Sequence, residues 1–157
     1  MATLHLMVGL PGSGKTTRAK QLEAEYGALR LTPDEWHIHL FGDDFHGWAD
    51  SAEHDRRHTR VEQLMWQTAR RVLALGVDVI LDFGCWAREE RDAFRAGAYA
   101  VGAGFKIHYM DCPREELDRR LQARNAAAGS QPSFCVSRAD IDRWSEIFEP
   151  PAPDELA

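Results

Sequence analysis

Residues 9–16, with the sequence GLPGSGKT, constrain the fold of this chain more than any other stretch. They fit the pattern G-x-x-x-x-G-K-[ST], a glycine-rich loop that binds phosphate groups. Glycines let consecutive backbone N–H groups turn onto an anion, and the helix that follows adds the positive end of its dipole. In this pattern Lys15 reaches the β- and γ-phosphates, and the hydroxyl of Thr16 ligates Mg²⁺. The sequence therefore predicts a site for a nucleotide and Mg²⁺.

The residues on either side of the loop supply the context that the motif needs. Residues 3–8 are predicted to form a buried strand, and residues 17–26 a helix, since Ala19, Leu22 and Tyr26 recur at helical spacing. Strand, loop and helix in this order are what a phosphate-binding loop requires. The predicted nucleotide-binding residues of the loop and the first helical turn are Gly9, Pro11, Gly12, Ser13, Gly14, Lys15, Thr16 and Thr17.

Length and composition indicate one soluble domain. The chain has 157 residues, of which 44% are apolar and 28% charged, as in ordinary globular proteins. No apolar run reaches the roughly 18 residues of a membrane span, and no signal-peptide pattern is present, so a cytoplasmic protein is expected. Cys85, Cys112 and Cys135 are widely spaced, which argues against a disulfide framework or a zinc knuckle. The net charge of −6 disfavours a nucleic-acid partner, although a local patch of arginines would still allow one.

Asp34 follows a short predicted strand, residues 28–32, at a position where open α/β sheets bind ligands. The sequence predicts that a helix begins here, with Thr32 at the N-cap, Pro33 in the first turn and Glu35 completing a capping box. The two acidic residues could simply complement the helix dipole. That explanation is sufficient for Glu35, whereas the place of Asp34 at the end of a strand makes it a candidate ligand-binding residue.

Asp82 ends residues 77–82, which form the strongest predicted strand because they are mostly β-branched and aliphatic. A carboxylate at the carboxyl edge of the sheet matches the Walker B position, close to the Mg²⁺ that Thr16 would bind. Many strands end in aspartate for the sake of the turn, so the signal gains weight only beside the phosphate-binding loop. Thr16 and Asp82 are therefore the predicted metal ligands.

Arg120 and Arg124 lie four residues apart on a predicted helix that begins at Pro113, so they share one face. They could form a solvated basic face that pairs with Glu116, or two guanidinium groups that bind a polyphosphate. Residues 126–133 are small and polar, which is typical of a flexible lid connector.

The longest predicted helix, residues 51–75, carries His54 and His58 on one face. Two histidines at this spacing could bind a metal, as in the H-E-x-x-H motif. The glutamate of that motif is missing and the sequence shows no third ligand, so a solvated face or contacts to an anionic substrate fit better. His5 and His108 lie within predicted strands and are expected to be core histidines.

Residues 40–50 form an irregular segment with two glycines and three aromatic residues, which either pack beneath the following helix or line a substrate pocket. The remaining predicted elements are a helix over residues 88–101, a strand over residues 105–111, a helix over residues 138–148 and an extended tail from residue 149.

The order of these elements resembles that of the P-loop kinases, ATP-binding proteins of AAA type related to the kinase domain of polynucleotide kinase, zeta-toxin kinases and chloramphenicol phosphotransferase. The likeness covers nearly the whole chain. It is carried by residues 9–17, 32–34 and 81–83 and by the pair Arg120 and Arg124.

The resemblance implies a three-layer α/β/α P-loop NTPase fold like that of adenylate kinase, with a parallel sheet in the strand order 2-3-1-4. It implies a single kinase domain over residues 1–157, with a lid region at about residues 113–137. It also implies that Asp34 is the general base, while Arg120 and Arg124 contact ATP and stabilise the transferring γ-phosphoryl group. Together with Lys15 these are the expected catalytic residues.

The chain departs from the polynucleotide kinases near the expected base. Their arginine three residues after the base, which holds the phosphate of the nucleic acid, is replaced by His37. The expected acceptor pocket is richer in tryptophan, with Trp36, Trp48 and Trp86 as candidates, and residues 150–157 do not supply the fifth strand common in such kinases. These departures favour a small-molecule acceptor.

The sequence thus leads to one main hypothesis and two alternatives. The main hypothesis is an ATP- and Mg²⁺-dependent kinase that phosphorylates a hydroxyl group of a small molecule. The first alternative is a 5′-hydroxyl polynucleotide or nucleoside kinase. The second is a nucleotide-binding NTPase switch without phosphotransfer. Asp34 argues against this second alternative, because nucleotide hydrolysis would not need a carboxylate at that position.

Overall fold

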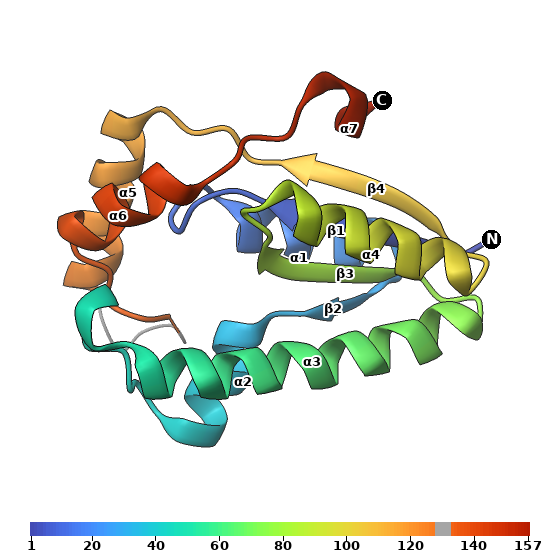
Figure 1. Cartoon of the computed structure of the whole chain (residues 1–157), viewed down its shortest axis with the longest axis horizontal. Coiled ribbons are helices and arrows are strands. Elements are labelled where there is room, and N and C mark those ends of the chain that lie inside the picture. The colour runs from blue at the N-terminus through green and yellow to red at the C-terminus, as the bar shows by residue number, and fades with distance from the viewer. Residues whose placement is uncertain (128–132) are drawn as a thin grey trace.

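Parallel strands in the order β2-β3-β1-β4 form the central sheet of the computed structural model (Figure 1), which describes residues 1–127 and 133–157. Within these residues the sheet consists of β1 (Thr3–Val8), β2 (Leu29–Leu31), β3 (Val79–Gly84) and β4 (Gly104–Tyr109). Every pairing is parallel, with Leu6 beside Leu81 of β3 and Ile107 of β4. The strand order that the resemblance implied is therefore confirmed.

Helices cover both faces of the sheet and make three layers (Figure 1). Helix α1 (Lys15–Tyr26) packs on one face, while α3 (Ala52–Ala74) and α4 (Arg88–Ala100) pack on the other. The other helices are α2 (Pro33–Phe41), α5 (Arg114–Ala126), α6 (Arg138–Ile147) and the short α7 (Pro153–Leu156). The three-layer α/β/α architecture expected from the sequence is confirmed.

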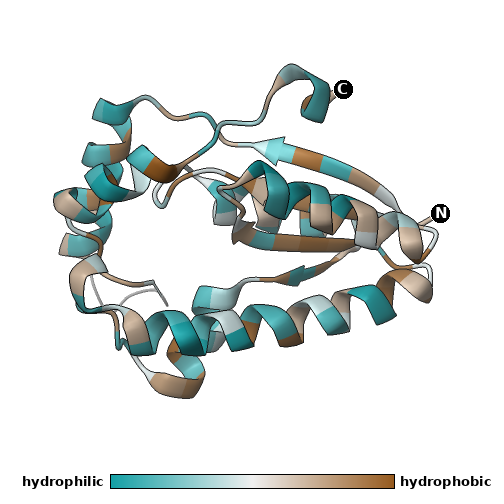
Figure 2. Ribbon diagram, in the orientation of Figure 1, coloured by the Kyte–Doolittle hydropathy of each residue, from teal (hydrophilic) through white to brown (hydrophobic). Residues whose placement is uncertain are grey.

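The two faces of β1 explain this layering. Leu4 and Leu6 are fully buried against the apolar stripe of α3, whereas Met7 points to the opposite face and packs with Leu22 of α1. Successive side chains of a strand point to opposite faces, so an apolar residue at nearly every position indicates a strand buried on both sides. Figure 2 shows the apolar strands at the centre and the hydrophilic outer sides of the helices.

A separate apolar cluster, which contains Leu117, Leu121, Val136 and Ile141, joins α5 to α6 and to the segment before α6. These helices lie beyond the carboxyl ends of the strands, next to the phosphate-binding loop (Figure 1). Residues 128–132, part of the predicted lid connector, lie outside the described residues. The cluster positions α5, which carries the two arginines of interest, over the end of the sheet.

The prediction of an extended tail is wrong at its end, because Pro153–Leu156 forms α7 against β4. Glu155 of α7 makes an ion pair with Arg91 of α4, with distances of 2.7 and 3.0 Å, and the side chains are 1% and 0% exposed. The hydrogen bonds from Arg91 outweigh the effect of burial and lower the pKa of Glu155 to about 2. A charged pair between residues 64 positions apart could not be read from the pattern of a proline-rich tail.

The predicted capping box at the start of α2 is also wrong. Thr32 is the N-cap, but its side chain makes no capping hydrogen bond, and Glu35 instead binds Arg30 at 3.1 Å. The hydroxyl of Thr32 donates to Asp82 at 3.2 Å. The side chain of Thr32 therefore contacts the polar end of the sheet and does not cap the helix.

Across the described ranges, no helix is both long and apolar enough to cross a membrane.

Candidate functional site

The phosphate-binding loop has the backbone conformation that its glycines predict. Gly14 is the N-cap of α1, with a left-handed φ of 97°, and Gly12 has φ of 84°. A Cβ at Gly12 would lie 2.9 Å from Cγ of Leu121 on α5, so a larger residue could not fit there without displacing that helix. The loop is thus shaped both by the turn into α1 and by the close approach of α5.

Lys15 bends back over the loop, and its Nζ donates a hydrogen bond of 2.8 Å to the carbonyl oxygen of Leu10. Burial lowers the pKa of Lys15, although Asp82 and Asp34 act in the opposite direction. An ammonium group held over a glycine-rich loop at the start of a helix is well placed to attract the phosphates of a nucleotide. Lys15, which follows β1, and Asp34, which follows β2, line the same cleft.

Thr16 and Asp82 come together as the sequence predicted. The hydroxyl of Thr16 donates a hydrogen bond of 2.6 Å to Oδ2 of Asp82, which also accepts from Thr32. The other oxygen, Oδ1 of Asp82, is buried and has no hydrogen-bond partner among the described residues. Burial raises the pKa of Asp82, against the opposing effects of Thr16 and Lys15. An unpaired buried carboxylate oxygen beside a threonine hydroxyl suits Mg²⁺, a hard cation that prefers oxygen ligands.

The two arginines of α5 have different surroundings. Arg120 donates to Oε1 of Glu116 at 2.6 Å and to the carbonyl oxygen of Ser13 in the phosphate-binding loop at 3.3 Å. The predicted pairing with Glu116 is confirmed for Arg120, which also reaches the phosphate-binding loop. Its exposed side-chain fraction is 44%, so the ion pair contributes little to stability.

Arg124 is more buried and has fewer partners. One of its terminal nitrogens donates to the carbonyl oxygen of Phe134 at 3.3 Å, and its Nε is buried without a partner in the described part of the chain. Burial lowers the pKa of Arg124, and the nearby charge of Asp34 partly compensates. A guanidinium stays charged in proteins, so this arrangement leaves a buried positive charge available to an anion.

Asp34 lies at the start of α2 with its side chain 50% exposed. Its Oδ1 is 3.6 Å from Nε2 of His58 on α3, and the same nitrogen is 3.5 Å from Oε1 of Glu62. Burial raises the pKa of Glu62 to about 8, with repulsion from Glu90 and Asp34 adding to the effect, whereas burial lowers the pKa of His58. Nε2 of His58 therefore lies between the side chains of Asp34 and Glu62.

One cleft of about 990 Å³ contains both the nucleotide-binding residues and these acidic residues. The predicted site residues at its lining are Pro11, Gly12, Ser13, Gly14, Lys15, Thr16, Thr17, Asp34, Asp82, Arg120 and Arg124. Gly9, the first residue of the loop, is not among the lining residues, and its carbonyl oxygen accepts a hydrogen bond of 3.3 Å from the indole of Trp86. The structure thus brings the predicted residues to one cavity.

The aromatic lining of the cleft differs in part from expectation. Trp86 lines it, but Trp36 and Trp48 do not, and their residues are 39% and 47% exposed. Sequence reasoning missed Trp144 of α6, which packs against Trp86 with ring centres 5.5 Å apart. Phe45, from the irregular aromatic segment, also lines the cleft, so for this residue the pocket interpretation is correct.

His54 and His58 have a third imidazole beside them, which the sequence did not reveal. His37 of α2 lies beside them, and one nitrogen of each of the three side chains is within 4.8 Å of the other two. The signal in the sequence was the presence of His37 where related kinases have arginine, but its distance from α3 along the chain hid the contact. His5 is buried as predicted and binds His108 at 2.9 Å.

Comparison with known proteins supports the fold. A search of curated proteins finds no significant match. The solved structures include a candidate kinase from Chloroflexus aurantiacus, with 20% identity over 97% of this chain and 83% of that one and a TM-score of 0.76. Kti12 from Chaetomium thermophilum, in complex with ADP-AlF3, has 24% identity over 96% and 82% and a TM-score of 0.70. The APS kinase CysC from Mycobacterium tuberculosis has 22% identity over 96% and 83% and a TM-score of 0.54.

A family model described as an AAA domain matches residues 4–151, which include every predicted site residue. The match therefore covers the phosphate-binding loop, both aspartates and the arginines of α5. Because the match spans nearly all of the 157 residues, this chain belongs to the AAA-domain family, and its fold is similar to those of the solved kinase structures.

Proposed function

We propose that this protein is an ATP-dependent kinase that transfers the γ-phosphoryl group to a hydroxyl group of a small molecule. The observation that carries the proposal is the position of Asp34, a half-exposed carboxylate that lines the same cleft as Lys15 and Arg124. A switch that only binds or hydrolyses a nucleotide would not need such a residue, whereas a kinase needs a base for its acceptor hydroxyl.

The proposed reaction assigns a role to each polar group. Asp34 accepts the proton of the acceptor hydroxyl while the hydroxyl oxygen forms a bond to the γ-phosphorus. The bond from that phosphorus to the β–γ bridging oxygen breaks, and ADP leaves. Lys15 and Arg124 stabilise the negative charge on the phosphoryl oxygens, and the backbone N–H groups of residues 12–16 hold the phosphates. Charge stabilisation and positioning are the main requirements of phosphoryl transfer.

Mg²⁺ would be held by Thr16 and Asp82, since Asp82 Oδ1 is buried without a partner among the described residues. When bound, it would neutralise charge on the β- and γ-phosphates. Arg120 would contact the nucleotide from α5, because it already reaches the carbonyl oxygen of Ser13. These assignments rest on contacts within this chain and on the general chemistry of P-loop kinases.

Several features of the acceptor side support a small molecule over a polynucleotide. The cleft wall beside Asp34 carries Glu62, Glu90 and His58, while the basic residues Lys15, Arg120 and Arg124 line the part next to the phosphate-binding loop. Proteins that bind a nucleic acid usually meet its phosphate backbone with lysine and arginine, and this wall offers acidic side chains instead. The aromatic side chains Trp86 and Trp144 also offer flat apolar surface to a ring-containing acceptor.

A screen for transfer of the labelled γ-phosphoryl group of ATP tests the proposal. The purified chain would be incubated with nucleosides, sugars, hydroxyl-bearing antibiotics and 5′-hydroxyl oligonucleotides in turn. Label on a small hydroxyl compound, lost in Asp34→Asn but retained in the exposed control Asp50→Asn, is the expected result. Label found only on oligonucleotides would favour the polynucleotide kinase. Release of inorganic phosphate alone, unaffected by Asp34→Asn, would favour the NTPase switch and overturn the proposal.

A further inference from the structure

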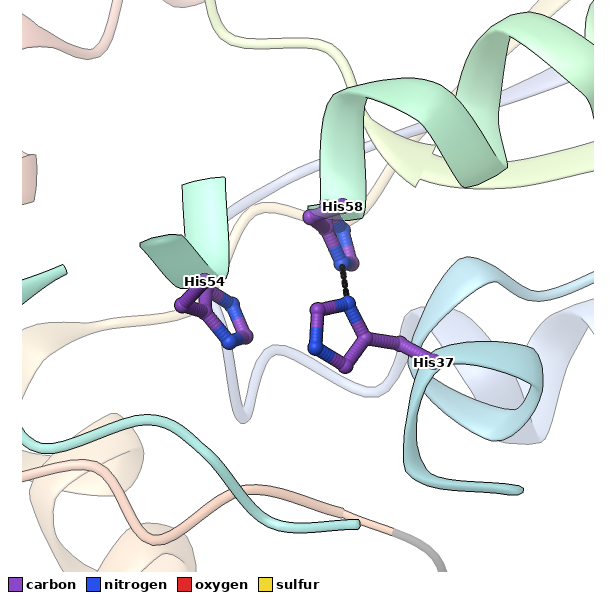
Figure 3. Close-up of side chains that lie close together, drawn as sticks. All are labelled: His37, His54 and His58. Atoms are coloured by element: carbon purple, nitrogen blue, oxygen red, sulfur yellow. Dashed lines mark hydrogen bonds between the residues drawn. The ribbon is translucent and has the colours of Figure 1, made fainter. Parts of the chain in front are cut away.

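A cluster of three imidazoles lies where α2 meets α3, beside the cleft (Figure 3). His54 and His58 come from consecutive turns of α3, and His37 comes from α2 (Figure 3). Their ring centres are 4.4 Å apart for His37 and His54, and 5.4 Å apart for each of the other two pairs. Three imidazoles bound to one tetrahedral Zn²⁺ at about 2.0–2.1 Å have ring centres roughly 5 Å apart, so these separations fit a shared ion.

Asp44 fixes the orientation of two of the rings. Its Oδ1 lies 2.7 Å from Nε2 of His37 and 2.8 Å from Nδ1 of His54, so both nitrogens are engaged with the same oxygen. Arg57 donates to the other oxygen, Oδ2, at 2.9 Å and holds the carboxylate in place. If each ring donates an N–H to Asp44, then Nδ1 of His37 and Nε2 of His54 have free lone pairs.

The third ring is arranged in the same way. Nε2 of His58 lies near two carboxylates, 3.6 Å from Asp34 and 3.5 Å from Glu62, while its Nδ1 is 3.4 Å from Nδ1 of His37 (Figure 3). Two nitrogens bound to one tetrahedral Zn²⁺ lie about 3.3 Å apart. Each of the three rings therefore has one nitrogen beside a carboxylate, as the outer N–H groups of metal-bound histidines usually do.

The surroundings of the cluster favour a metal site over a solvated group of histidines. His37 is fully buried and His54 is 8% exposed. The ring of Phe134 meets His54 edge-on at 4.7 Å and His37 at 5.3 Å, which covers the cluster with apolar surface. The cluster therefore places three imidazole nitrogens within 4.8 Å of one another beneath an aromatic ring, within reach of one ion.

We propose that His37, His54 and His58 bind a divalent transition-metal ion, with Zn²⁺ as the best match, through Nδ1 of His37, Nε2 of His54 and Nδ1 of His58. Imidazole nitrogen favours Zn²⁺ over Mg²⁺, so this site is distinct from the oxygen site at Thr16 and Asp82. The ion would fasten α2 to α3 and thereby hold Asp34, which lies one turn before His37 on α2. The site does not depend on the proposed kinase activity.

The test measures metal binding by the complete, tag-free chain after treatment with a chelator, in buffer with millimolar Mg²⁺ to fill oxygen sites. Isothermal titration with Zn²⁺ is expected to give one tight site per chain. Co²⁺ is expected to give the intense visible absorption of a four-coordinate ion. His37→Gln and His54→Gln should each weaken Zn²⁺ binding by about 100-fold or more, whereas the exposed His39→Gln should bind like the wild type. Asp44→Asn, which keeps all three rings, should weaken binding by about 10–100-fold.

An additional measurement avoids any problem of variant folding. Two-dimensional ¹H–¹⁵N spectra of the wild-type imidazoles should show that Zn²⁺ shifts Nδ1 of His37 and His58 and Nε2 of His54. Shifts at these nitrogens support the proposal even if a glutamine variant does not fold. Absence of stoichiometric Zn²⁺ binding by the wild type would overturn it. Tight binding that persists unchanged in folded His37→Gln and His54→Gln would overturn it as well. Neither result would bear on phosphotransfer, which the labelled-ATP screen tests separately.

Discussion

Oδ1 of Asp34 lies 3.6 Å from Nε2 of His58, which is longer than a hydrogen bond. The carboxylate of Asp34 therefore lies beside His58 without a hydrogen bond to it, and half of its side chain is exposed to solvent in the cleft. A general base needs an oxygen that can still accept a proton from the substrate. The relationship between these two residues is compatible with that requirement and leads to the first prediction.

Asp34→Asn should lower phosphotransfer by about 100-fold or more while leaving ATP affinity nearly unchanged, because the amide cannot accept the proton of the hydroxyl. The measurement is the rate of product formation at saturating ATP, together with ATP binding by titration. Asp50→Asn, which removes an exposed carboxylate from the turn before α3, is the matched control. Equal rates for Asp34→Asn and the wild type would contradict the assignment of the base.

Lys15→Ala should abolish nucleotide binding or turnover, since it removes the ammonium group that reaches the β- and γ-phosphates. ATP binding by isothermal titration and ATP turnover measure the two effects. Lys106→Ala provides the control, because Lys106 is exposed on β4 away from the cleft. A Lys15→Ala protein that bound and used ATP normally would refute the nucleotide site at this loop.

Arg124→Ala should lower the turnover number by about 10³-fold, the lower end of the range for an arginine that stabilises the transferring phosphoryl group. Arg124→Lys should restore little of this loss, because an ammonium group lacks the planar fork of donors. Arg119→Ala is the control on the same helix, since its side chain is 73% exposed and pairs with Glu116. If Arg119→Ala lost as much activity as Arg124→Ala, a general effect on α5 would explain both.

Glu155→Gln should lower the free energy of unfolding by about 3–5 kcal/mol, because it leaves the buried guanidinium of Arg91 without its counter-charge. Asp154→Asn, one residue earlier, should cost much less, since it removes an exposed ion pair with Arg88. Urea denaturation of the two variants makes the comparison. Similar losses of stability in both variants would show that the buried pair of Arg91 and Glu155 stabilises the fold no more than the exposed pair does.

The lowered pKa of His108, which contacts His5, predicts that the folded protein loses stability in mild acid. Burial, followed by repulsion from His5 and Lys106, lowers the pKa of His108 to about 4 from 6.5. In the unfolded chain His108 therefore binds a proton near pH 6.5, whereas in the folded chain it binds one only near pH 4. This contribution to stability is present above pH 6.5 and is lost as the pH falls toward 4.

The measurement is the melting temperature at several pH values between 7 and 5, which covers the upper part of the pH interval in which stability should fall. His108→Gln should flatten the decline relative to the wild type, because glutamine does not titrate there. His46→Gln, an exposed histidine of the loop after α2, should leave the decline as it is. A wild-type protein whose stability did not fall in this interval would contradict the lowered pKa.

The sequence was sufficient for those parts of the site that local chemistry determines. The phosphate-binding loop follows from its glycines and Lys15, and the parallel sheet follows from runs of apolar residues buried on both sides. The contact between Thr16 and Asp82 could be predicted because Asp82 lies near the carboxyl end of β3 and Thr16 lies in the helix that follows the neighbouring strand β1. In a parallel sheet, such edges bring distant residues together by topology.

Contacts that depend on side-chain packing between helices could not be predicted in this way. His37 joins His54 and His58 only because α2 packs against α3, and no periodicity in either segment indicates that packing. Trp144 reaches Trp86 for a similar reason, through the position of α6 beyond the strands. The buried pair of Arg91 and Glu155 was hidden because single charged residues usually lie at the surface.

The hydrogen bond of 3.3 Å from the Trp86 indole to the carbonyl oxygen of Gly9 connects a fluorophore directly to the phosphate-binding loop. Trp144, 5.5 Å away, faces the same cleft, whereas Trp66 packs against Phe94 in the core. Indole emission depends on polarity and on hydrogen bonding at the ring nitrogen. The fluorescence of Trp86 and Trp144 is therefore expected to change when a ligand enters the cleft, so occupancy of the cleft can be followed by intrinsic fluorescence without attaching a dye.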